Sequence, residues 1–223
     1  MHFDGRLISE ITEDDIRHLV ENKVQEDETI EFKREPYGGT AQWNEKKLEL
    51  CCDVASFANA NGGYIIIGIG DRKGRANSLC AIPEPKPHID RMLKVCLDGI
   101  EPRIADLQIE PISLGSEGSV IVIRIGQSTS QTHMVNHRHQ THFVRRYRDG
   151  KREMSYAEIR QAFLSDLPLR LLREMNAKLD ELLQRSPWPA EAPPGAESNA
   201  LEAETPQAVQ AIMEARLREE AGQ

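Results

Sequence analysis

The chain has 223 residues, of which 39% are hydrophobic and 29% are charged, and its formal net charge at pH 7 is −8. This length allows one sizeable hydrophobic core. The chain carries neither an apolar run long enough to cross a bilayer nor a basic-then-apolar leader, so we expect a cytoplasmic protein without membrane contact. The four cysteines, at positions 51, 52, 80 and 96, lack the CxxC spacing of zinc knuckles and do not suggest a disulfide framework.

An acidic segment, residues 1–11, precedes the first predicted helix. Thr12 is followed three residues later by Asp15, which is the spacing of a capping box. The apolar residues that follow recur at helical spacing. The sequence therefore predicts an amphipathic helix that begins at Thr12 and ends near Lys23.

The segment from Thr29 to Arg34 alternates apolar with charged residues, which is the period-two pattern of a half-buried strand. Glu31 and Lys33 therefore lie on one face of the predicted strand. An acid and a lysine in this arrangement recur in metal-dependent nucleases, where the carboxylate holds a cation and the ammonium offsets phosphate charge. The alternative is an ordinary charge pair on a solvated strand face.

The next predicted helix covers residues 44–60 and stops at Asn61-Gly62-Gly63, because glycine supplies the left-handed geometry that helix ends favour. Residues 64–69 form a nearly continuous apolar run, which predicts a central strand covered on both faces. Asp71 follows this run, at the rim where open α/β sheets bind ligands. The nearby glycines match neither a Walker loop nor a GxGxxG motif, so we expect no nucleotide cofactor.

Glu26 is the third acid of interest. It lies five residues before Glu31, so the two would face opposite sides of one regular strand. They converge only if the chain bends or if the strand begins near Asp27. If Glu26, Glu31 and Asp71 do converge, their oxygens suit Mg²⁺ or Mn²⁺, and their mutual repulsion requires a cation or a raised pKa.

The second half of the chain begins with a Pro-rich loop, and four features are predicted after it. These are a helix over residues 89–97, a hairpin of strands 106–112 and 119–125, a strand over 141–148, and a helix over 156–163 that follows Ser155.

Charge is distributed unevenly along the chain. Residues 1–35 carry five Lys and Arg against eleven Asp and Glu, residues 166–223 carry six against eleven, and the intervening segment carries seventeen against fourteen. A basic stripe in this middle segment predicts a nucleic-acid contact, although a solvated strand would look similar. The predicted binding residues are Arg138, His139, Arg145, Arg146, Arg148, Lys151 and Arg152.

The histidines at positions 133, 137, 139 and 142 leave a zinc site open as a further alternative, but their spacing does not define its geometry.

The C-terminal part divides into three predicted segments. Residues 166–186 form an amphipathic helix, with apolar residues at three- and four-residue spacing that suit either a short coiled coil or packing onto the parent domain. Residues 187–204 are a Pro-rich linker, and residues 205–223 form a short, acidic helical tail. This whole region, residues 166–223, is a candidate surface for a protein partner.

Three segments resemble the Schlafen-type divergent AlbA domain family. They are EDETIEFKR, then SFANANGGYIIIGIGD, then THFVRRYRDGKREMSYAEIRQAF. The resemblance implies an α+β fold over residues 12–165, with a single mixed sheet and flanking helices, followed by the C-terminal helix and a flexible acidic tail. It also implies binding of DNA or RNA.

Some members of this family are metal-dependent endoribonucleases that cut tRNA or rRNA. By resemblance, Glu26, Glu31 and Asp71 would be both catalytic residues and ligands of Mg²⁺ or Mn²⁺, Lys33 would assist them, and Arg145 matches the arginine of the closing strand. A single domain of this kind would pair with a second copy, which predicts a homodimer or a higher oligomer. The alternatives to cleavage of tRNA or another structured RNA are a non-catalytic DNA- or RNA-binding regulatory module and an interaction or scaffold subunit.

Overall fold

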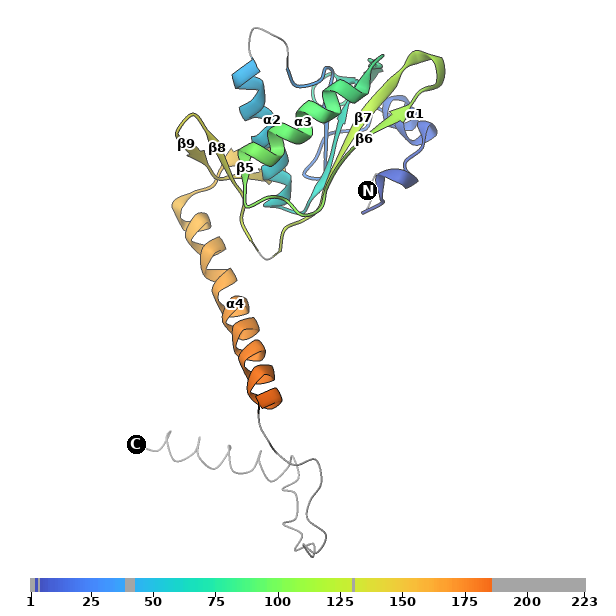
Figure 1. Ribbon diagram of the computed structural model, residues 1–223. Coiled ribbons are helices and arrows are strands. Elements are labelled where there is room, and N and C mark those ends of the chain that lie inside the picture. The colour runs from blue at the N-terminus through green and yellow to red at the C-terminus, as the bar shows by residue number, and fades with distance from the viewer. Residues whose placement is uncertain (1–2, 4, 39–42, 130, 186–223) are drawn as a thin grey trace, which may run out of the picture. The chain divides into compact units, whose positions relative to one another are not determined.

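The computed structural model describes residue 3 and residues 5–38, 43–129 and 131–185. Helices and strands are mixed along the chain (Figure 1), and the predicted α+β fold class is confirmed. The helices are α1 (Glu13–Glu21), α2 (Trp43–Ala58), α3 (Pro85–Gly99) and α4 (Tyr156–Arg185), with short 3-10 helices at Ile8–Glu10 and Gly115–Glu117.

The main sheet has four strands in the order β1 (Ile30–Lys33), β2 (Gly63–Ile67), β7 (Ser119–Ile125) and β6 (Leu107–Ser113). β1 runs parallel to β2, whereas β2–β7 and β7–β6 are antiparallel. The sheet is therefore mixed, and the predicted hairpin of the second half is confirmed as β6 and β7.

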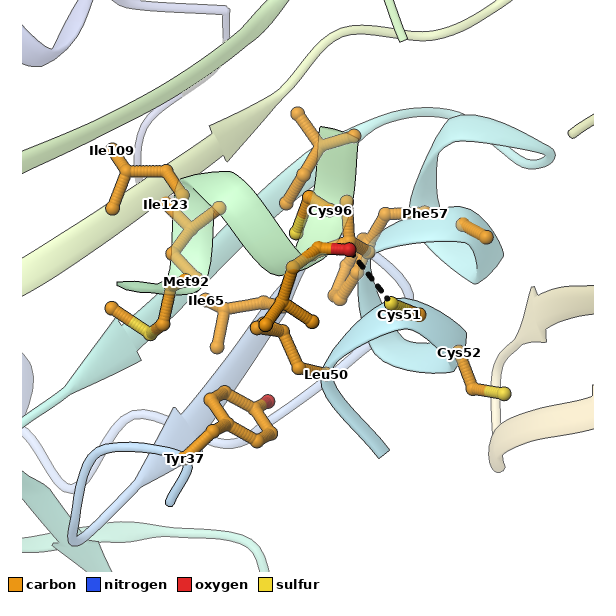
Figure 2. Close-up of a cluster of buried hydrophobic side chains, with 14 of the residues drawn as sticks. Tyr37, Leu50, Cys51, Cys52, Phe57, Ile65, Met92, Cys96, Ile109 and Ile123 are labelled. Carbon is orange, nitrogen blue, oxygen red and sulfur yellow. Dashed lines mark hydrogen bonds between the residues drawn. The ribbon is translucent and has the colours of Figure 1, made fainter. Parts of the chain in front are cut away.

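Each face of the sheet supports its own hydrophobic core. On one face, residues of α2 and α3 pack against alternate residues of the strands, and Figure 2 shows Phe57 of α2 and Met92 of α3 in the same cluster as Ile65 of β2. On the other face, α1 packs through Ile16 and Leu19. The side chains of β2 therefore alternate between two buried environments, which explains its unbroken apolar sequence.

The helix ends follow the predicted capping chemistry. Thr12 and Asp15 form the capping box of α1, and Gly62, with a φ of 71°, donates its N–H to the Phe57 carbonyl at 2.9 Å just after α2. α3 begins before the predicted start, at Pro85, because proline is well suited to the first turn of a helix.

The chain turns sharply at Gly68, so the predicted strand over 64–69 is wrong in its extent. β2 ends at Ile67, and β3 (Ile69–Asp71) pairs instead with β4 (Ala76–Leu79) in a separate hairpin. Gly68 has a φ of 103°, and a Cβ there would lie 3.1 Å from a methyl carbon of Val120. Only glycine accommodates this turn without strain.

Five short strands complete the fold. β5 (Ile100–Glu101), β8 (Met134–His137) and β9 (Gln140–His142) form one small sheet, and β10 (Val144–Tyr147) pairs with β11 (Gly150–Glu153) in a hairpin. The predicted single strand over 141–148 is wrong, since it is divided between β9 and β10, and β11 was not predicted.

α4 runs without interruption through Pro168, so the predicted helices 156–163 and 166–186 are parts of one helix. Ser155 caps its start as predicted, because the Ser155 hydroxyl accepts the Glu158 N–H and the Glu158 carboxylate accepts the Ser155 N–H.

The chain divides into two units after Glu174, so α4 begins in the first and ends in the second. The predicted linker 187–204 and tail 205–223 lie outside the described residues. No helix in the described part of the chain is both long and apolar enough to span a membrane.

Candidate nucleic-acid interface

The predicted pairing of Glu31 and Lys33 is confirmed. Both side chains point from β1 toward α2, and the Lys33 Nζ lies 2.6 Å from Glu31 Oε1. The same ammonium lies 3.4 Å from carboxylate oxygens of Glu49 and Asp53 on α2. The β1 lysine therefore joins the edge strand of the sheet to the helix that covers it.

Asp53 is the most deeply buried acid of this group, with only 1% of its surface exposed. One of its oxygens accepts a hydrogen bond from the Tyr37 hydroxyl at 2.6 Å, and the other accepts one from Lys151 on β11. A buried carboxylate requires such partners because its desolvation is costly. Asp53 therefore connects α2, β1 and the β10–β11 hairpin.

Arg146 is also buried, with 8% of its surface exposed. Its guanidinium donates to the Glu31 carboxylate and, at 3.1 Å, to the backbone carbonyl of Asp27. It lies over the Phe57 ring, 4.8 Å from the centroid. Arg146 therefore points into the molecule, where it fixes β10 against β1 and α2.

Strand alternation divides the predicted basic stripe into two sets. Arg146 pairs across the hairpin with Lys151, and both contact the buried acids, whereas Arg145 pairs with Arg152 on the opposite face. In the description that follows, the buried network consists of Glu31, Lys33, Asp53, Arg146 and Lys151.

The opposite face carries the cations that solvent can reach. Arg152 is exposed and stacks on the Tyr147 ring, 4.4 Å from its centroid, and Arg145 is half-buried beside them. Two acids lie close by, Asp149 at 3.3 Å from Arg152 and Glu158, which accepts the Tyr147 hydroxyl. We call Arg145, Tyr147 and Arg152 the outer face of the hairpin.

A second group of exposed residues lies on the neighbouring β8–β9 hairpin. Arg138 and His139 form the two-residue turn between β8 and β9, and both have positive φ values of 46° and 68°. Such values are typical of a type I′ hairpin turn, although Asn and Gly are the usual residues there. His142 of β9 contacts Glu153 of β11 at 2.8 Å, so the two hairpins are linked. Arg148 is exposed in the β10–β11 turn.

Glu26 approaches Glu31 because the chain bends between them. The Asp27 carboxylate accepts the backbone N–H groups of Thr29 and Ile30 at 2.7 and 3.1 Å, which fixes a tight turn. Glu26 then accepts the Phe32 N–H at 2.8 Å. The bend on which the predicted convergence depended is therefore present.

Asp71 lies at the end of β3 rather than at the end of the central strand. Its carboxylate is exposed and accepts the Gly74 N–H at 3.0 Å, and the Gly74 carbonyl accepts the Glu26 N–H at 2.7 Å. Burial, and then the charges of Glu31 and Asp71, raise the pKa of Glu26 above its ordinary value. The Glu26 carboxylate therefore lies within electrostatic range of both other acids.

The metal site expected at Glu26, Glu31 and Asp71 stays a prediction. Among the described residues, no group of three or more His, Cys, Asp or Glu side chains is placed to hold a metal ion. Lys33 and Arg146 contact the two oxygens of Glu31. Burial alone would raise the pKa of Glu31, but the charges of these two cations outweigh burial and lower it. The charge of the Glu31 carboxylate is therefore balanced by Lys33 and Arg146.

Glu26 and Glu31 should respond oppositely to loss of charge. Because the pKa of Glu26 is raised in the folded state, its contribution to folding stability is fully present below the pKa of the unfolded chain and is lost as pH rises. Because the pKa of Glu31 is lowered, its contribution to folding stability is present at high pH and is lost as pH falls. At pH 7 we expect Glu26→Gln to raise the melting temperature by roughly 1–3 °C. Glu31→Gln should lower it by roughly 4–8 °C, because it weakens two buried ion pairs.

Thermal unfolding of Glu26→Gln and Glu31→Gln, followed by circular dichroism at pH 7 and pH 4, tests these two predictions. The two shifts should shrink at pH 4, where both carboxylates are largely protonated in the unfolded chain. A fall in melting temperature for both variants at pH 7 would contradict the electrostatic assignment of Glu26.

His133 has a structural role. Its ring is buried between the Pro102 carbonyl and the Ser128 hydroxyl, at 2.7 and 2.6 Å, and burial lowers its pKa. The Asn59 side chain, at the end of α2, hydrogen-bonds the backbone of His133 and Val144 at 2.8–2.9 Å. The segment before the double glycine therefore holds β8 and β10 in place.

Three residues of this region, Tyr37, Asp53 and Tyr147, were not predicted from the sequence. The available signal for Asp53 was a lone acid inside the apolar run Cys51-Cys52-Asp53-Val54-Ala55, since an unpaired charge is rarely buried. The signal for Tyr147 was its place two residues from Arg145 on one strand face.

Comparisons with known proteins place these features in context. The model of the Schlafen, AlbA_2 domain family matches residues 26–155, more than half of the chain. Among solved structures, the DIP2311 protein from Corynebacterium diphtheriae is similar, with 18% sequence identity over 64% of this chain and a TM-score of 0.41. The match covers 26% of that protein, so the chain spans about a quarter of its length. A comparison with curated proteins finds no match.

Proposed function

The chain belongs to the Schlafen, AlbA_2 domain family, and from that membership, which indicates nucleic-acid binding, we propose that it binds structured RNA or DNA through the outer face of the β10–β11 hairpin and the β8–β9 turn. The observation that carries the proposal is the division of the basic stripe. Arg146 and Lys151 form ion pairs with the buried acids Glu31 and Asp53. Arg145 and Arg152 lie on the opposite face of the hairpin, and the β8–β9 turn is exposed.

The outward residues combine the two chemistries that polynucleotides require. Arginine side chains neutralise phosphates and release counterions, and an aromatic ring such as Tyr147, stacked with Arg152, offers a surface on which a base or a ribose can pack. The basic residues of this surface lie on short strands and turns. Contacts to shape and backbone suit a folded RNA such as tRNA better than base reading in a DNA groove.

A salt titration of binding tests this function. Fluorescence anisotropy with labelled tRNA and with a DNA duplex of similar length should give a dissociation constant that rises steeply with salt, with tRNA bound more tightly. Each phosphate contact contributes about 0.9 to the slope of log affinity against log salt. An affinity that is absent at about 150 mM salt for both ligands would refute binding and favour the interaction or scaffold subunit.

A metal-dependent endoribonuclease is the second candidate. It is favoured by one observation, the electrostatic interaction of Glu26 with Glu31 and Asp71. In this proposal these three acids are the catalytic carboxylates, assisted by Lys33, and Mg²⁺ or Mn²⁺ is the cofactor. Because the acids do not form a metal site as they stand, cleavage would require Glu31 to exchange its protein cations for the metal.

The nuclease assay uses total tRNA on a denaturing gel, with and without Mn²⁺ or Mg²⁺. If the candidate is correct, discrete fragments appear only with metal, and Asp71→Asn abolishes them without unfolding the protein, because Asp71 is exposed. Asp14→Asn, at another exposed position, is the control and should cleave normally. Intact RNA in every lane, with binding retained, would identify a non-catalytic module.

We further propose that the chain forms a homodimer and that residues 166–223 contribute to contacts with protein partners. Within the described part of this region, α4 exposes Leu172, Met175, Leu179 and Leu182 at three- and four-residue spacing, as in a coiled-coil seam. Sedimentation equilibrium of the full chain measures its oligomeric state. A monomer at protein concentrations of tens of micromolar would refute the proposed homodimer. A cytoplasmic location remains part of the proposal.

A further inference from the structure

A cavity of about 380 Å³ lies between α2, α3 and β8, away from the buried network. Its floor is apolar and is formed by Leu48, Cys51, Val95 and Val135. The Cys51 Sγ donates to the Val95 carbonyl at 3.6 Å, the contact drawn in Figure 2, so α2 and α3 are tied together behind this floor. Its volume falls within the range of small-molecule sites, roughly 300–1,000 Å³.

The rim of the cavity is cationic. Lys47 comes from α2, Arg91 and Lys94 come from α3, and the single acid among the lining residues is Asp98. A concave apolar floor with several cations at one side suits a ligand that has a flat apolar body and an anionic group.

His137 of β8 supplies a polar side chain to the same cavity, whereas the Asn136 amide is engaged by Glu101 and Thr141. Burial, and then the charges of Arg138, His142 and Lys47, lower the pKa of His137. This shift favours the neutral imidazole, which can both donate and accept a hydrogen bond. The His137 imidazole and the Asp98 carboxylate are hydrogen-bonding groups of the kind that recognise the polar edge of a nucleobase.

The cavity adjoins the proposed nucleic-acid surface. His137 is the last residue of β8, and Arg138 and His139 follow it directly in the exposed turn. A strand whose phosphates contact this turn would bring its neighbouring nucleotide to the mouth of the cavity. This continuity favours a nucleotide over an unrelated amphiphilic anion.

We infer that the cavity between α2, α3 and β8 holds one nucleoside monophosphate unit, namely an unpaired nucleotide of the bound strand, with its base on the apolar floor and its phosphate at Lys47, Arg91 and Lys94. The inference rests on the proposed function, to which it adds a preference for unpaired nucleotides. Extrusion of a nucleotide costs little where it is already unpaired, so bulges and single-stranded ends are the expected substrates.

The first test compares two RNA duplexes of equal length, one fully paired and one with a single-nucleotide bulge. The protein should bind the bulged duplex about tenfold more tightly. Lys94→Glu should remove that preference, because it reverses a charge at the rim, while it leaves affinity for the paired duplex within about twofold. Lys86→Glu is the matched control, since Lys86 is exposed on the same helix and does not line the cavity. An unchanged preference in Lys94→Glu would overturn the inference.

The second test uses free mononucleotides, with inorganic phosphate as the competing probe, in calorimetric titrations. Binding of mononucleotides that is lost in Lys94→Glu supports the cavity, and equal binding of phosphate alone overturns it. If neither duplex binds but mononucleotides do, the proposed function fails and the cavity is a site for the free nucleotide. If both duplexes bind equally and mononucleotides do not bind, the cavity assignment fails and the proposed function stands.

Discussion

Asp53→Asn should lower the free energy of unfolding by about 3–5 kcal/mol. The substitution preserves the size of the side chain, so its effect is electrostatic. It removes the charge that lies 3.4 Å from Lys33 and that accepts a hydrogen bond from Lys151. Breaking a buried ion pair from one side leaves the partner charges uncompensated, and this is the costly case.

Urea denaturation at pH 7 measures the change. Asp14→Asn is the control, since Asp14 is exposed on α1, and it should stay within about 0.5 kcal/mol of the parent protein. Adding Lys151→Met to Asp53→Asn should recover part of the loss, because one of the uncompensated cations is then gone. Equal stability of Asp53→Asn and Asp14→Asn would show that the buried network does not stabilise the fold.

Local sequence signals predicted those parts of the fold that depend on neighbours in the chain. The capping box at Thr12, the stop at Gly62 and the hairpin of β6 and β7 are all confirmed. The turn at Gly68 could not be read in the same way. Gly68 lies within a nearly continuous apolar run, and the close neighbour that leaves no room for a Cβ there is Val120, which is distant in sequence.

The candidate site shows the same limit. Strand periodicity correctly predicted that Glu31 and Lys33 lie on one face of β1. The same rule, applied to the apolar Val144, would have predicted that Arg146 two residues later is also buried. The ion-pair partners of these residues could not be predicted from local patterns. Arg146 and Glu31 are 115 positions apart in the sequence, and Lys151 and Asp53 are 98 apart. Pairings of that length depend on the tertiary fold, which a single sequence does not specify residue by residue.

The β10–β11 hairpin therefore has two faces with different tasks. Its inner cations, Arg146 and Lys151, hold the hairpin against β1 and α2, and substitutions there should alter stability first. Its outer cations, Arg145 and Arg152, lie on the opposite face of the hairpin from these two, and they are the cations that the proposed function assigns to phosphates. This separation means that binding can be removed without unfolding the protein, which is the condition for a clean functional test.

The double variant Arg145→Glu with Arg152→Glu should weaken binding to tRNA by roughly 100-fold at about 150 mM salt. Both residues pair directly across the hairpin on its outer face, so the change replaces two adjacent cations with two anions. If each arginine contacts one phosphate, the slope of log affinity against log salt should fall by about 2. The melting temperature should change by less than about 3 °C, because neither guanidinium belongs to the buried network.

Anisotropy titrations at several salt concentrations measure both quantities, and circular dichroism measures the melting temperature. The control carries the same change in net charge elsewhere, Arg72→Glu with Lys86→Glu, at two exposed positions outside this surface. Because long-range repulsion alone would weaken both variants equally, only a much larger loss in the hairpin variant assigns binding to the outer face. Equal losses would mean that net charge, rather than this surface, governs the affinity.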